Sequence, residues 1–95
     1  MLVAVTDHAE ERYRQRVRGT LDARGEIVAR VSRAWAAGSV SRDPARRGTA
    51  DVRDGQLIFV CREDRPRGEL VVVTLWEEGE EPVTPRRFTD ALRRR

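Results

Sequence analysis

One histidine and two arginines recur at intervals of four residues near the start of the chain. They are His8, Arg12 and Arg16, in a stretch whose composition suits a helix. Because residues four apart lie on the same side of an α-helix, an imidazole and two guanidinium groups would project along one stripe. Imidazole groups exchange protons close to neutral pH, and guanidinium groups bind phosphate oxygens through paired hydrogen bonds. Such a stripe could hold a phosphate group and move a proton.

Cleavage of RNA without a metal ion needs the functional groups of this stripe. The reaction requires a base for the 2′-hydroxyl proton, an acid for the leaving 5′-oxygen, and cations beside the phosphate. His8 would act as acid or base, and Arg12 and Arg16 would hold the phosphate. Thr74, in the middle of an otherwise apolar segment, is the additional polar group that could contact a substrate.

Each of these residues also has an ordinary structural interpretation. A lone histidine in the first turn of a helix is often a half-exposed residue that bonds only to its own chain. Arg12 and Arg16 would then form ion pairs with acids of a sheet, and Thr74 would bond to a neighbouring carbonyl. The sequence leaves both interpretations open for all four residues. Trp35 and Trp76 are expected to be packing residues, with base stacking as the alternative.

Two amphipathic helices are predicted in the first half of the chain. A cap at Thr6 or Asp7 begins the first helix, which ends at Gly19. On its polar side, glutamate precedes arginine by four residues at positions 10 and 14, the favourable order for a surface pair. A cap at Thr20 or Asp22 begins the second helix. Its apolar residues recur every three or four positions, and these are Ile27, Val28, Val31, Ala34 and Trp35.

Three strands are predicted in the second half, within Asp51–Arg53, Gln56–Arg62 and Glu69–Trp76. An Asp-Gly pair joins the first two as a tight hairpin, and the third should be the central strand. The apolar segment Leu2–Val5 suits a further strand. The predicted fold class is therefore α+β, with two N-terminal helices packed on a twisted antiparallel sheet of three to four strands. A short C-terminal helix or tail from Thr84 is expected to follow.

Length and charge limit the possible functions. At 95 residues the chain is expected to form a single domain, 1–95. All 19 basic residues are arginine, which a GC-rich genome would also produce, so arginine content alone is weak evidence for phosphate recognition. The segment Arg12–Arg53 holds eleven arginines and four acids, a balance of +7 that permits RNA binding. The acidic run Glu77–Glu81 is interpreted as a solvated loop.

The cysteine content and the hydropathy bear on cofactors and location. Cys61 is the only cysteine, so the chain has no internal disulfide and a reducing compartment is implied. With one histidine and one cysteine a zinc site is poorly supported, and neither a metal nor another cofactor is expected. No signal peptide or membrane-length apolar run is visible, so we expect a cytoplasmic protein without a membrane partner.

The pattern His8-Ala9-x-x-Arg12-Tyr13-x-x-Arg16, followed by the two apolar strands, resembles small proteins of phages and bacterial mobile elements. These look related to RelE-like toxins and to the wider superfamily of barnase-like and colicin D-like ribonucleases. The resemblance covers about residues 6–76 and implies two helices on a twisted antiparallel sheet with a basic face for RNA. His8, Arg12, Arg16 and Thr74 are the positions that match. The chain departs from RelE-like toxins in having no lysine.

The sequence therefore predicts an RNA-directed protein, interpreted as a metal-independent endoribonuclease of the toxin or phage-effector type. The alternative is a phage-type protein that binds and inhibits a host or defence protein without catalysis. RNA is the expected partner, and a protein partner, either an antitoxin or a host target, is the second possibility.

Overall fold

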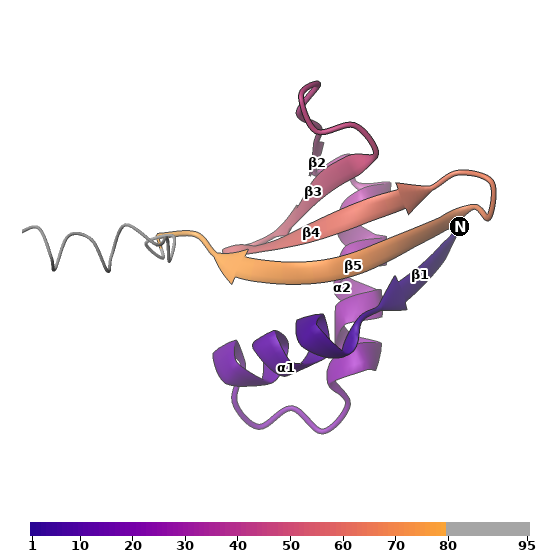
Figure 1. Ribbon diagram of the computed structural model, residues 1–95. Helices are drawn as coiled ribbons and strands as arrows, with labels where there is room; N and C mark the ends of the chain where they lie inside the picture. Colours follow the sequence, from indigo (N-terminus) through magenta and orange to yellow (C-terminus); the bar gives the residue numbers. More distant parts are fainter. Residues whose placement is uncertain (80–95) are drawn as a thin grey trace, which may run out of the picture.

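The computed structural model describes residues 1–79, which form two helices and one five-stranded sheet (Figure 1). In chain order the elements are β1 (Leu2–Val5), α1 (Asp7–Arg16), α2 (Ala23–Ala36), β2 (Val40–Ser41), β3 (Thr49–Asp54), β4 (Leu57–Asp64) and β5 (Glu69–Glu77). The fold class is α+β, as predicted. The C-terminal helix or tail expected from Thr84 lies outside the described residues.

The sheet has more strands than predicted and is mixed. Its strand order is β1-β5-β4-β3-β2, and the four strands from β2 to β5 pair antiparallel. The expectation of a purely antiparallel sheet was wrong, because β1 pairs parallel with β5 from Leu2 opposite Glu69 to Val5 opposite Val72. The prediction that Glu69–Trp76 is the central strand was also wrong. β4 is central, because the two-residue strand β2 extends the sheet beyond β3.

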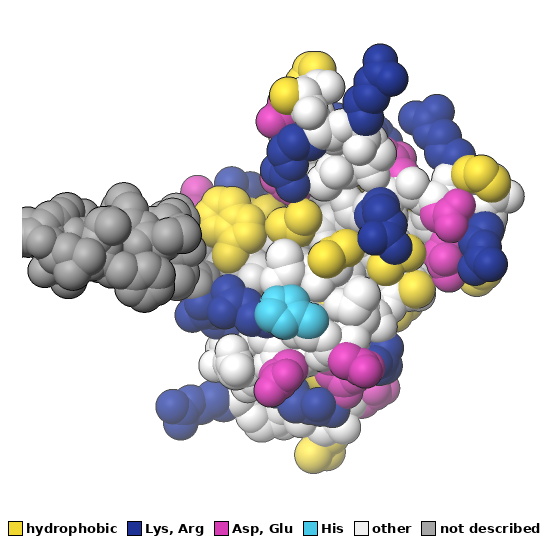
Figure 2. Space-filling model, viewed as in Figure 1, with side chains coloured by type: hydrophobic (Ala, Val, Ile, Leu, Met, Phe, Trp, Pro, Cys, Tyr) yellow, Lys and Arg dark blue, Asp and Glu magenta, His cyan; other side chains and the backbone are white. Residues whose placement is uncertain are grey.

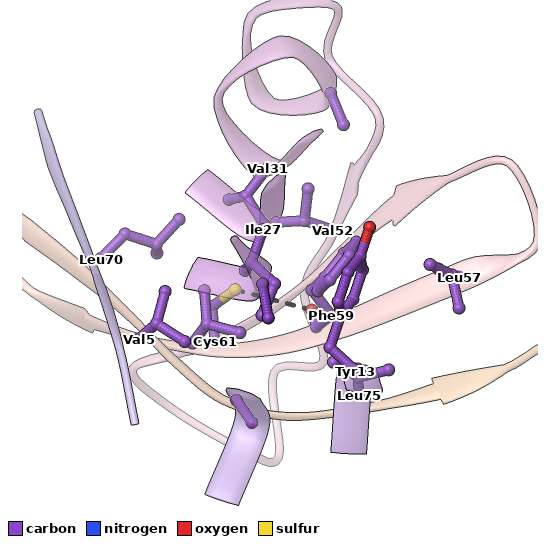
Figure 3. Packing of buried hydrophobic residues seen from close by; sticks show 14 residues of the cluster. Val5, Tyr13, Ile27, Val31, Val52, Leu57, Phe59, Cys61, Leu70 and Leu75 are labelled. Carbon is purple, nitrogen blue, oxygen red and sulfur yellow. Dashed lines mark hydrogen bonds between the residues drawn. The ribbon is translucent and has the colours of Figure 1, made fainter. Parts of the chain in front are cut away.

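The core lies between the helices and the inner face of the sheet (Figure 3). Val52, Phe59 and Leu75 form one row across three strands, because Val52 pairs with Phe59 and Phe59 with Leu75. Ile27 of α2 and Tyr13 of α1 belong to the same buried cluster, and none of the five is more than 1% exposed. Burial of each such side chain contributes about 1.5–3 kcal/mol to stability. This core holds α1 against β5 and α2 across β3.

The other side of the sheet, which we call the outer face, is not covered by α1 or α2. Its members include Val60, Arg62, Val71, Thr74 and Trp76, since side chains of a strand alternate between the two faces. Figure 2 looks onto this side and shows hydrophobic side chains along it, with arginine side chains around them. Trp76, expected to be a packing residue, is 37% exposed. The outer face therefore presents apolar side chains on β4 and β5 next to polar and charged ones, among them Asp51 of β3 opposite Val60.

Candidate functional site

Thr6 fastens the start of α1 to the edge of β5. Its hydroxyl accepts a hydrogen bond from the Ala9 amide at 3.1 Å, which makes it the N-cap of the helix. The same hydroxyl donates to the Val73 carbonyl at 3.0 Å, and the Thr6 amide donates to the Val72 carbonyl at 3.1 Å. The start of the helix that carries His8 is thus fixed relative to the strand that carries Thr74.

A β-bulge in β5 lies at this point of attachment. Val60 of β4 pairs with Thr74, whereas the next residue, Cys61, pairs with Val72, so Val73 is the extra residue of β5. Bulges redirect the backbone groups of a strand and interrupt its ladder. The carbonyl of Val73 accepts the Thr6 hydroxyl bond, so the bulge is joined directly to the helix cap.

Arg12 continues this attachment along the strand edge. Its Nε and Nη2 donate to the Leu75 carbonyl at 3.3 and 3.2 Å. β1 ends its pairing at Val72, so Thr6 and Arg12 bond to β5 where β1 no longer does. The side chain therefore reaches over the neighbouring strand, as expected for a residue at the border of the buried face. It meets β5 at the residue that follows Thr74.

The other predicted site residues lie along the same border with different exposure. His8 is exposed, Arg16 is half-buried at the end of α1, and Thr74 is half-buried on the outer face. Figure 2 shows the histidine in cyan, with arginine side chains beside it and hydrophobic side chains of the outer face above it. The arrangement brings a proton-exchanging group and positive charge to the edge of an apolar surface.

The opposite side of α1 forms ion pairs that hold the two helices together. Glu10 pairs with Arg14, which confirms the pair predicted from the spacing of four residues. Glu10 also pairs with Arg24 of α2 at 2.7 Å, and Arg24 further bonds to Asp7 and to the Val5 carbonyl. These charged residues have structural partners, in contrast to the exposed imidazole of His8.

Tyr13, the tyrosine of the motif His8-Ala9-x-x-Arg12-Tyr13, is buried and has a structural role. Its hydroxyl donates to Glu26 Oε1 at 2.8 Å, and the Arg30 guanidinium lies 5.7 Å from the centre of its ring. Burial, and next the bond to Glu26, raise the pKa of Tyr13. The Thr20 hydroxyl, and next the bond donated by Tyr13, lower the pKa of Glu26. The tyrosine therefore stays protonated and ties α1 to α2 through its hydroxyl.

Cys61 is unsuited to act as a nucleophile. It is fully buried on the inner face of β4, and its thiol lies 3.6 Å from the Phe59 carbonyl (Figure 3). Burial is the main cause that raises the pKa of Cys61 to about 12, with smaller effects from Asp51 and Glu63. The thiolate required for attack is therefore scarce at neutral pH.

Residues 1–79 contain neither a cluster of metal-binding side chains nor a helix suited to span a membrane. No three His, Cys, Asp or Glu side chains in this part gather as a metal-binding group. No helix in this part is long and apolar enough to cross a membrane.

No protein-family model, no curated protein and no solved structure matches the chain.

Proposed function

We propose that the protein binds RNA along the border between α1 and the outer face and cleaves it without a metal ion. The observation that carries the proposal is the exposed imidazole of His8 on the helix whose Arg12 is fixed to β5 beside Thr74. A proton-exchanging group and a cation are held by elements that the core makes rigid. Rigid placement is what acid–base catalysis requires of its groups.

In the proposed reaction, neutral His8 takes the proton of a 2′-hydroxyl group. The 2′-oxygen forms a bond to phosphorus as the bond from phosphorus to the 5′-oxygen breaks, and water gives a proton to the leaving oxygen. The products are a 2′,3′-cyclic phosphate and a 5′-hydroxyl end. Arg12 and Arg16 stabilise the negative charge that grows on the phosphate.

Purified protein should cleave single-stranded RNA in EDTA, and His8→Ala should abolish this cleavage. Because His8 is exposed, the substitution should change the free energy of unfolding by less than about 0.5 kcal/mol. Gln15→Ala, at another exposed position of α1, is the matched control and should keep full activity. RNA with a 2′-deoxy sugar at the scissile position should bind and remain intact, because it lacks the attacking oxygen.

Two results would remove the catalytic proposal: equal cleavage by His8→Ala, or none by the wild type at high protein concentration. In the second case RNA binding separates the remaining possibilities. Retained binding would leave an RNA-binding protein without catalysis, whereas lost binding would favour the protein-inhibitor interpretation.

A further inference from the structure

A cavity of about 550 Å³ lies away from α1, between the β2–β3 loop and the β4–β5 turn. Its volume falls within the range of small-molecule sites in proteins, about 300–1,000 Å³. Figure 1 shows the loop and the turn extending from the sheet beyond the ends of β3 and β4. We call this hollow between the loop and the turn the basic cavity. Its charged lining residues are Arg42, Asp43, Arg46, Arg47, Glu63 and Arg65.

One wall of the basic cavity is fixed by Arg42. Its Nε and Nη2 donate to the two carboxylate oxygens of Glu63, both at 3.0 Å. The guanidinium also lies 5.4 Å from the centre of the Trp35 ring. Two parallel bonds and a ring contact hold the side chain in one orientation. The Arg42–Glu63 pair carries no net charge, and Glu63 also interacts electrostatically with Arg65.

Three further arginines supply the positive charge of the basic cavity. Arg46, Arg47 and Arg65 are exposed, and none of them forms an ion pair with a residue of the described range 1–79. Asp43, the other acid of the lining, accepts the Ala45 amide at 2.9 Å. Four arginines against two carboxylates give the lining a net charge of +2. Like charges brought together around a hollow attract an anion of matching size.

The basic cavity and Thr74 are connected through β4, although the Glu63 side chain of the cavity wall points to the inner face, opposite to Val60 and Arg62. Glu63 of its lining is three residues beyond Val60, which pairs with Thr74. Three residues of a strand span roughly 10 Å. Arg62, exposed on the outer face, lies between these two positions. Figure 2 shows the histidine on the same side of the molecule as arginine side chains in the region of the loop and the turn.

We propose that the basic cavity binds a phosphate group of the RNA strand, on one side of the bond cleaved at α1. The inference rests on the proposed function and specifies its substrate as an extended single strand with at least two phosphates. The strand would cross the outer face, with Val60 and Val71 beneath its bases and Arg62 beside its backbone. Arg46, Arg47 and Arg65 would bind the second phosphate.

The double variant Arg46→Gln/Arg47→Gln tests the cavity. Its affinity for a single-stranded octanucleotide with 2′-deoxy sugars, which cannot be cleaved, should fall about tenfold at low salt. The slope of log K against log salt should become less negative by about 0.7, the value for one phosphate contact with a single strand. The control is Arg14→Gln/Arg33→Gln, which removes two exposed arginines elsewhere and changes the net charge equally. Its slope should equal that of the wild type.

A dinucleoside monophosphate separates the cavity from the cleavage site, because it has one phosphate and cannot occupy both. The ratio of kcat/KM for a cleavable octanucleotide to that for the dinucleotide should fall about tenfold in Arg46→Gln/Arg47→Gln. A salt slope equal to that of the control would overturn the cavity proposal, whether or not RNA is cleaved. A reduced slope without any cleavage by the wild type would support the cavity and overturn the catalytic function.

Discussion

Arg12 stabilises the junction of α1 and β5 as well as the proposed phosphate contact. Its two bonds satisfy the carbonyl of Leu75, a residue that is 1% exposed. Loss of a partner for a shielded carbonyl costs about 1–3 kcal/mol. Arg12→Ala should therefore lower the free energy of unfolding by about this amount, measured by urea denaturation. An unchanged urea midpoint would show that water replaces both bonds.

Cys61 gives a pH dependence whose sign follows from its burial. The pKa of its thiol rises from an ordinary 9.0 to about 12 on folding. Between these values the unfolded chain has lost the thiol proton and the folded chain keeps it, so stability falls as pH rises. The full contribution of Cys61 to the free energy of unfolding is therefore present below pH 9. Compared with Cys61→Ala, the wild type should lose more stability between pH 9 and 11, measured by denaturant titration at each pH. Parallel curves would contradict the assignment.

Native Cys61 should also resist a thiol reagent at pH 8 and react once the protein is unfolded in urea. Rapid reaction of the native thiol would show that β4 opens more easily than its burial indicates.

At the scale of elements, Thr6 is the residue on which the placement of α1 depends. Its hydroxyl caps the helix and bonds to the bulge in β5. Thr6→Ala removes both bonds and should lower the free energy of unfolding by about 1–3 kcal/mol. Thr6→Ser keeps the hydroxyl and should retain most of the stability. Equal losses in the two variants, measured by thermal and urea unfolding, would assign the effect to the lost methyl group.

Local patterns predicted most elements but little of their arrangement. The Asp54-Gly55 turn and the apolar run of β4 were predicted because turn residues and hydrophobic runs act over a few neighbours. The parallel partner of β1 could not be predicted from the sequence. Leu2 pairs with Glu69, and four apolar residues carry no information on a partner so distant in the chain. β2 has only two residues, too few for a periodic pattern.

The candidate site also has one part that local sequence patterns predict and one part that depends on contacts distant in the chain. The spacing of four residues predicted that His8, Arg12 and Arg16 share one side of α1, since helix geometry alone decides this. The acceptor of Arg12 is a backbone carbonyl 63 residues away, and every residue type offers a carbonyl. The sequence therefore held no signal for that contact. From the sequence, the arginines of the β2–β3 loop contribute only to a net charge. The basic cavity itself forms because the fold brings this loop and the β4–β5 turn together.

For the molecule as a whole, the outer face connects two separate sites of positive charge. α1 lies at one border of this face, and the basic cavity lies beyond the ends of β3 and β4. The surface between them includes the half-buried Val60 and Val71, with Asp51 and Arg62 as their cross-strand neighbours. Single-strand-binding surfaces combine basic grooves with groups on which bases can pack. This arrangement favours an unpaired strand over a duplex, in which bases are not available to the sheet.

Trp76 tests whether bases contact the outer face. It is 37% exposed and lies two residues after Thr74 on β5. Stacking of one base on an aromatic ring contributes about 1–3 kcal/mol to binding. Trp76→Ala should therefore weaken binding of a labelled single-stranded octanucleotide by this amount, measured by fluorescence anisotropy, whereas Trp76→Phe should retain much of the affinity. Leu21→Ala, at an apolar position that is 99% exposed, is the control and should bind as the wild type does. Equal affinity of Trp76→Ala and the control would mean that the strand follows the arginines without stacking on the sheet.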